Sequence, residues 1–532
     1  MKKVSPAGKP AKLPRNPRKV EAPPKLSLND ETLSALMETL LARGALGEQG
    51  PSADELFGDL LDRIEDAGIE KAGDVFAELI PALDETRMDA NGGDPEAREA
   101  LREIDRMLRE AVADDILGPG DMMIIGKIFA DAGLPPPEHL KAAFARAWKE
   151  AGPGQGGESS REHGASLRKE ALEEGDDPFR IFDLVHSMTC ILPVEAKIPI
   201  FSHLAEDPAA AQALAGFLFD PDDATAIAAA EALTEAANNA PVASAALERL
   251  VLVRPWLASA RQAAVDEAIK AMRRNVLPAK VAAAVKTLKC VATLCDGSGA
   301  MQFLAGQKAG TRYRVVAIMT KPTGVADAFV LDALPKREMD GVIARIKSSV
   351  AATETDLEAL AGLLRSALGE NLASKTPPPF KTAQAVEALG LGPVYPFSET
   401  PSELVDRLLA DAPPQTSGAV LFNAPIEVAG QDIADGWFEG VADVEKLLKP
   451  VRGRQKRVKK LLEAYLPGRR AFWARQCALS ALVLRNARDR IYKNWLQLAL
   501  TGRDIACDRP LAEIPLMTRI AEQTVLAFER SL

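Results

Sequence analysis

Proline spacing constrains this chain more than any other feature, because proline cannot continue a helix but suits its first turn. From about residue 178 to 296, prolines stand mostly at apparent helix starts, and alternate prolines are 33, 34 and 37 residues apart. They are Pro208, Pro221, Pro241, Pro255 and Pro278. These intervals have the length of one helix-turn-helix unit. The spacing therefore predicts consecutive helical hairpins.

A short motif recurs at nearly the same interval. Glu231-Ala232-Leu233 returns as Glu267-Ala268-Ile269, 36 residues later. Stacked units of this kind bury their apolar faces against their neighbours. In period and punctuation, residues 178–296 resemble the HEAT/armadillo class of α-solenoids. The resemblance implies an extended surface for binding other macromolecules.

Composition favours the same architecture. Hydrophobic residues make up 47% of the 532 residues, and aromatic residues make up 5%. Alanine is abundant, and it is the strongest helix former. We therefore predict a mostly α fold: a helical-repeat (HEAT-like) α-solenoid or multi-helix array with a small β-hairpin insertion.

One segment breaks the helical pattern. Residues 312–319 alternate between two faces, Lys321-Pro322-Thr323-Gly324 has the composition of a turn, and residues 325–331 favour a strand again. Proline at the second position suits such a turn. We expect a β-hairpin here, supported by the helices around it.

The chain divides into segments of distinct composition. Residues 151–166 are rich in glycine and serine, which predicts a flexible spacer. The predicted division is a disordered basic tail at 1–27, an acidic helical domain at 28–150, a flexible linker at 151–177, HEAT-like helical repeats at 178–310, a β-hairpin plus helix at 311–350, helices and an irregular Pro/Gly-rich segment at 351–440, and a basic helical C-terminal domain at 441–532.

Charge is distributed unevenly around a net value of −10. Residues 29–115 carry 24 acidic and eight basic side chains, whereas residues 449–493 carry 14 basic and two acidic ones. Such asymmetry indicates a partner more than a fold. The candidate binding residues are Arg452, Arg454, Lys456, Arg457, Lys459, Lys460, Arg469, Arg470, Trp473 and Arg475.

The basic block leaves three interpretations open. It docks on a protein partner or on the acidic domain of the same chain, it forms a solvated helix face, or it binds nucleic acid. In the last case cations would follow phosphates while Trp473 or Tyr465 stacks on a base. We expect a protein partner first and nucleic acid as the alternative, and the oligomeric state stays open.

Catalytic motifs are missing from the sequence. It contains no P-loop, HExxH, EF-hand or GxSxG match, and the chain has four histidines. Gly152, Gly154 and Gly157 fit GxGxxG, but no strand precedes them, so we interpret them as part of the spacer. We therefore predict no catalytic residue, no metal site and no cofactor.

A motif-free enzyme is kept as a further alternative. Asp296-Gly297-Ser298-Gly299 is typical of a turn, and it could also present backbone N–H groups to an anion. The candidate catalytic residues of such an enzyme are Asp296, Ser298, Arg312 and Arg314. Cys290 and Cys295, read as helical, would not share a face and do not complete a zinc site.

Sorting signals are not recognisable. No apolar run approaches the ~18 residues that a membrane span requires. The basic, proline-rich start has no apolar stretch typical of a signal peptide. We expect a cytoplasmic protein without membrane association, and a non-enzymatic helical scaffold or adaptor that binds a protein partner.

Overall fold

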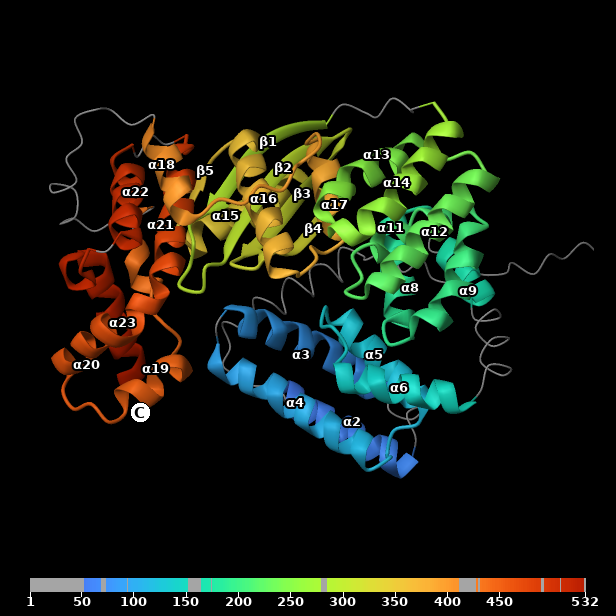
Figure 1. Cartoon of the computed structure of the whole chain (residues 1–532), viewed down its shortest axis with the longest axis horizontal. Coiled ribbons are helices and arrows are strands. Elements are labelled where there is room, and N and C mark those ends of the chain that lie inside the picture. Colours follow the sequence, from blue (N-terminus) through green and yellow to red (C-terminus); the bar gives the residue numbers. More distant parts are fainter. Residues whose placement is uncertain are drawn as a thin grey trace, which may run out of the picture. The chain divides into compact units, whose positions relative to one another are not determined.

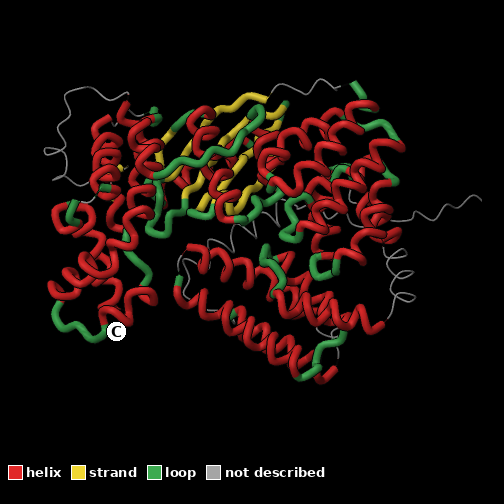
Figure 2. Tube along the Cα trace, in the orientation of Figure 1, coloured by secondary structure: helices red, strands yellow, loops and turns green. Residues whose placement is uncertain are grey.

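Most of the described chain is helical, and a five-stranded antiparallel sheet interrupts the helices (Figure 1). The computed structural model describes residues 52–67, 73–92, 94–151, 164–173, 175–278, 285–410, 427–428, 431–488, 492–507 and 509–530. Figure 2 shows the strands as one yellow group among red helices. The predicted mostly α fold is confirmed. The predicted basic tail at 1–27 lies outside the described residues.

Five helices form the first part of the described chain. They are α2 (Ala53–Ala67), α3 (Gly73–Gly92), α4 (Pro95–Ala113), α5 (Pro119–Asp131) and α6 (Glu138–Ala151). Asp94 caps α4, because its carboxylate accepts the N–H groups of Glu96 and Ala97 at 2.7 and 3.2 Å. Pro81 stands inside α3. Asp121 accepts the Gly118 N–H from inside α5.

The predicted flexible linker at 151–177 is wrong in part. Residues 164–173 are helical, and Leu167 and Ala171 are buried. These two residues are four apart, which places them on one helix face. Their burial stabilises a helix that the glycine-rich sequence before it had obscured.

The proline-punctuated region forms seven α-helices, as far as the structure describes it. They are α8 (Pro178–Thr189), α9 (Val194–Ala205), α10 (Pro208–Ala211), α11 (Leu214–Phe217), α12 (Asp223–Asn239), α13 (Ser244–Val253) and α14 (Ser259–Arg274). Helix α12 packs against both α9 and α14. The recurring motif lies on α12 and α14, where Leu233 and Ile269 are both buried. A HEAT-like arrangement of these helices stays a prediction.

Buried arginines connect these helices. Arg249 of α13 donates two hydrogen bonds to Glu387, at 2.7 and 2.9 Å. Arg261 of α14 bonds to the Asp223 carboxylate at 2.6 Å and to the carbonyls of Leu218 and Pro221 at 2.9 and 3.1 Å. A guanidinium can satisfy several acceptors at once. Arg261 thereby fixes the turn that leads into α12.

A five-stranded antiparallel sheet follows. Its strands are β1 (Val285–Thr293), β2 (Met301–Ala309), β3 (Arg312–Lys321), β4 (Gly324–Leu334) and β5 (Ala352–Glu354), in the order β4-β3-β2-β1-β5. The predicted hairpin is β3–β4, where Ile318 faces Ala328. Gly324 in its turn has φ +120°, which favours glycine.

The expected helical repeats do not extend to residue 310. Residues 285–309 form β1 and β2 instead. Val285, Thr287, Val291 and Thr293 alternate along β1, and β-branched residues at this period favour a strand. The predicted helical placement of Cys290 is wrong for the same reason. Cys290 lies on β1 and Cys295 follows it, and both thiols are buried and free.

Helices return after the sheet. They are α15 (Lys336–Ser349), α16 (Leu357–Ser374), α17 (Lys381–Leu389), α18 (Pro401–Ala410), α19 (Val441–Leu448), α20 (Arg454–Lys460), α21 (Arg470–Arg485), α22 (Tyr492–Ala506) and α23 (Pro515–Arg530). Between α18 and α19 lie the short strands β6 (Glu427–Val428) and β7 (Gln431–Asp432) and the turn η4 (Ile433–Gly436), and a π-helical turn, η5 (Leu461–Tyr465), extends α20. Helix α15 packs on β1, β2 and β3, and α17 packs on β3 and β4. Among the described helices, none has the length and apolar character needed to cross a bilayer.

The Arg261 contacts make a testable contribution to stability. Arg261→Met removes three hydrogen bonds and leaves two backbone carbonyls without this donor. We expect the free energy of unfolding to fall by about 2 kcal/mol. Urea unfolding followed by circular dichroism measures it. As a control, Lys270→Met removes an exposed ion pair to Glu267 and should cost less than about 0.5 kcal/mol. Equal losses in both variants would contradict this account.

Candidate functional site

A cavity with a volume of about 880 Å³ lies among the described residues. Its walls come from α3, the end of α5 and the segment that follows it, α6, α8, α9, α11, the start of α12, β4 and residues 377–381. This volume lies in the upper part of the range of roughly 300–1,000 Å³ that small-molecule sites occupy. The cavity is therefore the candidate binding site.

Prolines form much of the cavity wall. The lining prolines are Pro135, Pro136, Pro193, Pro221, Pro377, Pro378 and Pro379. From sequence, the proline run at 135–137 predicts the start of a helix and the run at 377–379 predicts a break before the next helix. The fold brings both runs to one cavity. Proline has a fixed φ and no N–H group. This part of the wall is therefore stiff and carries few hydrogen-bond donors.

Helix α8 supplies an aromatic wall. Pro178 occupies its first turn, and the Asp177 carboxylate caps it by accepting the Phe179 N–H at 3.0 Å. Phe182 and His186 are four residues apart and therefore share one face. Their rings stack with centroids 5.1 Å apart and an interplanar angle of 16°. The ring of Phe217 lies 6.0 Å from that of His186.

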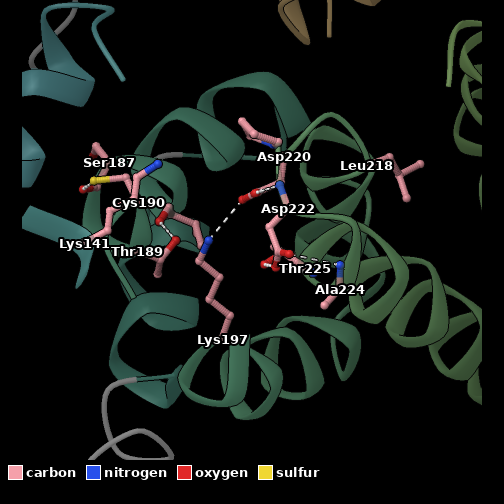
Figure 3. Close-up of polar contacts among 12 residues, drawn as sticks. Lys141, Ser187, Thr189, Cys190, Lys197, Leu218, Asp220, Asp222, Ala224 and Thr225 are labelled. Carbon is pink, nitrogen blue, oxygen red and sulfur yellow. Dashed lines mark hydrogen bonds and ion pairs between the residues drawn. The ribbon is translucent and has the colours of Figure 1, made fainter. Parts of the chain in front are cut away.

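An ion pair lies in the cavity wall between α9 and the start of α12 (Figure 3). Lys197 Nζ lies 3.0 Å from Asp220 Oδ2, and the two side chains are only 5% and 10% exposed. The other carboxylate oxygen of Asp220 accepts the Asp222 N–H at 2.9 Å. Lys197 and Asp220 are therefore held in place by the fold before any ligand arrives.

The Asp222 carboxylate already accepts hydrogen bonds from the protein. Its carboxylate caps α12 by accepting the N–H groups of Ala224 and Thr225 at 3.3 and 2.9 Å. The Thr225 hydroxyl donates to the same carboxylate at 2.8 Å. Figure 3 shows this cap beside Asp220. Asp222 thus fixes the local backbone while it lines the cavity.

His186 presents a neutral imidazole to the cavity. Burial, and then the positive charge of Lys197, lowers the pKa of His186 from its ordinary value of 6.5 to about 4. A neutral imidazole has one donor and one acceptor nitrogen. Within the described chain, no side chain or backbone group hydrogen-bonds to either nitrogen. Both remain available to a ligand.

Cys190 also lines the cavity, but its thiol is not activated. Burial raises the pKa of Cys190 to about 11, so the thiol stays protonated at neutral pH. It donates to the Ser187 carbonyl at 3.3 Å. A nucleophilic cysteine needs a thiolate. The arrangement therefore favours binding over covalent catalysis at this residue.

The remaining cations of the cavity wall have acidic partners. Lys141 lies 2.9 Å from Glu138, Lys381 lies 2.9 Å from Asp183, and Arg87 lies 3.9 Å from Asp327. Each of the three pairs is more exposed to solvent than the pair of Lys197. Burial raises the pKa of Asp183 and of Asp327 above its usual value. The lining thus offers charges of both signs side by side.

The basic residues predicted from sequence fall into two groups. Arg452, Arg454, Lys456 and Lys460 are exposed on or beside α20 and form no ion pair within the described residues. Lys459 lies 3.7 Å from Glu463 in the adjoining turn. These residues stand together on the surface, so the predicted binding role stays a prediction for them.

The other predicted basic residues hold the fold together. Arg457 lies 2.9 Å from Glu529, and its guanidinium is 5.0 Å from the ring of Phe528. Arg470 donates to three backbone carbonyls, and Arg475 pairs with Glu370 at 2.9 Å. These contacts bind α20 and α21 to their neighbours in the same chain.

Trp473 is buried rather than displayed. It is fully covered, and its indole N–H donates to the Glu439 carboxylate at 2.8 Å. Arg469 Nε donates to the same carboxylate at 3.0 Å and its guanidinium lies 3.9 Å from the ring of Phe472. The Tyr465 hydroxyl lies 3.4 Å from Glu439. With its faces covered, Trp473 cannot stack on a base in this conformation.

The suspected motif-free catalytic residues do not come together. Asp296 Oδ1 accepts the N–H groups of Ser298 and Ala300 and the Ser298 hydroxyl, each at 2.8 Å. Those N–H groups therefore do not form a free anion nest. Arg312 and Arg314 lie at the opposite end of the β2–β3 pair, because Ala309 faces Arg312 while Met301 faces Thr320.

Sequence reasoning missed the cavity residues, although one signal was present. In α9, Lys197 occurs at helical spacing with the buried Ile200, Phe201 and Leu204. A lysine on an apolar helix stripe must be buried, and buried lysines are rarely without a partner. The partner, Asp220, could not be inferred, because it lies 23 residues away in a turn.

Three family models match the chain. Their descriptions are "Uncharacterised protein y4lR N-terminal domain" over residues 12–137, "Y4lR second domain" over 193–275, and "Y4lR C-terminal helical domain" over 402–529. The second of these regions contains Lys197, Asp220 and Asp222. None of the three descriptions mentions HEAT or armadillo repeats.

A curated relative spans most of the chain. The sequence is 27% identical over 459 residues to "Uncharacterized protein y4lR" of Sinorhizobium fredii (strain NBRC 101917 / NGR234). The alignment covers 83% of this chain and 86% of that protein. No solved structure matches the chain significantly.

The depressed pKa of His186 predicts a pH-dependent stability. The unfolded chain binds a proton near pH 6.5 whereas the folded chain binds it only near pH 4. The contribution of His186 to the free energy of unfolding is therefore fully present above pH 6.5. As the pH falls from 6.5 toward 4, the free energy of unfolding decreases by about 3 kcal/mol. Unfolding curves between pH 4 and 7 for the wild type and His186→Gln measure this term. An unchanged pH dependence in the variant would contradict the assignment, since Asp183 and Asp327 titrate in both proteins.

The buried position of Trp473 predicts a structural role. Trp473→Phe removes the indole N–H and leaves Glu439 with one donor fewer in a buried site. We expect a loss of about 1–2 kcal/mol in the free energy of unfolding. Arg454→Ala, taken from the same predicted set but exposed, should change it by less than about 0.5 kcal/mol. Thermal unfolding of both variants distinguishes them, and a larger loss for Arg454→Ala would contradict this placement.

Proposed function

We propose that this chain is a non-enzymatic binding protein whose cavity takes a small organic ligand. The observation that carries the proposal is the convergence of the Lys197–Asp220 pair and the unbonded His186 imidazole on one cavity of about 880 Å³. A cavity that combines apolar surface with converging polar groups is the arrangement typical of ligand sites.

The buried ion pair supports this proposal on energetic grounds. Removing two charges from water costs several kcal/mol for each ion, so a buried pair adds little to stability by itself. Lys197 and Asp220 are both part of the cavity wall and do not lie inside a sealed core. Because folding does not require these two charges, ligand binding accounts for their presence in the wall.

The proposal can be tested by filling the cavity. Ala145 lines it and Ala147 does not, although both are half-buried on α6. Ala145→Trp should abolish ligand-induced stabilisation, while Ala147→Trp should retain it. The assay is thermal unfolding of the full chain with panels of amino acids, short peptides, sugars, nucleotides and aromatic heterocycles. A ligand at 100 times its Kd stabilises the folded state by about 2.7 kcal/mol.

Two results would count against the proposal. One is that no panel compound raises the Tm of the wild type. The other is that a compound stabilises Ala145→Trp as much as Ala147→Trp, because binding would then occur elsewhere. Circular dichroism before heating shows whether each variant has folded.

A scaffold or adaptor role is the second candidate, and one observation favours it. Arg452, Arg454, Lys456 and Lys460 form an exposed basic surface, which we call the α20 basic surface. Within this proposal the surface binds an acidic protein in the cytoplasm, and the α8–α14 helices act as a HEAT-like support. Electrostatic contacts of this kind weaken with salt.

Charge reversal tests the adaptor role. Replacing the four residues of the α20 basic surface with glutamate should remove a stoichiometric partner from pull-downs of the tagged full chain. Nuclease treatment should leave that partner in place. If the partner disappears with nuclease, the surface binds nucleic acid instead, and if it survives charge reversal, the surface is not the binding site.

A further inference from the structure

We infer that the cavity ligand is a short peptide with free termini and apolar side chains. This inference rests on the proposed function and adds the chemical class of the ligand. It follows from the charge balance of the wall, the hydrogen-bonding capacity that the wall leaves open, and the volume of the cavity.

Charge balance excludes a strongly charged ligand. The wall contains the cations Arg87, Lys141, Lys197 and Lys381, and each lies within 4 Å of a wall carboxylate at 3.9, 2.9, 3.0 and 2.9 Å. The fifth carboxylate, Asp222, caps α12. A polyphosphate or other polyanion would have to separate these pairs at a high desolvation cost. A zwitterion places one charge of each sign against them and breaks none.

The deep pair has spare capacity for a charged terminus. Lys197 Nζ carries three N–H donors and uses one on Asp220. A ligand carboxylate can accept another of these donors, and a ligand ammonium can donate to Asp220. The pairs Lys141–Glu138 and Lys381–Asp183 on the wall offer the same two possibilities to the opposite terminus.

The His186 part of the cavity wall suits a peptide backbone. A neutral imidazole has one donor and one acceptor nitrogen, and a peptide group offers the complementary acceptor and donor. His186 has both nitrogens free of the described protein, and Phe182 and the prolines provide apolar surface beside it. The volume of about 880 Å³ favours two to four residues over one free amino acid.

Isothermal titration of the full chain tests this class. The probes are leucyl-alanyl-leucine, its N-acetyl form, its C-terminal amide and free L-leucine. We expect the tripeptide to bind, and each blocked form to bind at least 10-fold more weakly because it loses one terminal charge. L-Leucine should bind more weakly than the tripeptide, because it fills less of the cavity of about 880 Å³.

The outcomes separate this inference from the proposed function. If a nucleotide, sugar or heterocycle stabilises the wild type but not Ala145→Trp, while the tripeptide does not bind, the cavity binds ligands but the peptide assignment is wrong. Equal affinity of the free and blocked tripeptides also overturns it. If no compound binds, both the assignment and the proposed function fail.

A double variant examines the role of the deep pair. Lys197→Met with Asp220→Leu removes both charges and keeps side chains of similar size, a change that buried pairs often tolerate. One of the two blocked forms will bind the wild type most weakly. We expect the affinities of that form and of the free tripeptide to differ by less than 3-fold in this variant. Lys270→Met with Glu267→Leu removes an exposed pair and should leave the discrimination intact. If the first variant does not fold, His186→Phe replaces it and should weaken the tripeptide at least 10-fold; an unchanged affinity would overturn the assignment.

Discussion

The Lys197–Asp220 ion pair is the interaction on which this account depends. It joins α9 to the turn before α12, and it is almost closed to solvent except at the cavity. A buried pair adds little to stability, so we explain its presence by the groups that lie beside it. The adjacent groups are the capping carboxylate of Asp222 and the neutral imidazole of His186. Together they give the cavity paired charges and free hydrogen-bonding groups within an apolar wall.

Local signals predicted much of the fold. Proline spacing and composition indicated the helices, and alternation at 312–319 indicated the β3–β4 hairpin. The β1 and β2 strands were missed because residues 285–309 were assigned to the helical repeats, with Cys290 read as helical. Pairing decides the outcome: Met301 to Ala309 pair with β3 along the whole length of β2, and β1 pairs in turn with β2. Pairing between distant segments is not visible in a local pattern.

The candidate site was not predictable in the same way. Its residues come from segments far apart in sequence, and the two proline runs gave no sign that they would meet. Lys197 alone had a readable signal, as a charged residue on an apolar stripe. The charge asymmetry pointed elsewhere, to the C-terminal basic block. There the fold uses Arg457, Arg470 and Arg475 internally and buries Trp473 against Glu439, so that net charge overstates the exposed basic surface.

Hydrogen exchange with and without the ligand that stabilises the chain locates the binding site most directly. The account predicts that added ligand slows exchange in α8, in α9 and in the segment that leads into α12, while α20 is unaffected. These elements carry His186, Lys197 and Asp220. Protection confined to α20, or to the β-sheet away from the cavity, would contradict the central claim that this cavity is where the chain binds its ligand.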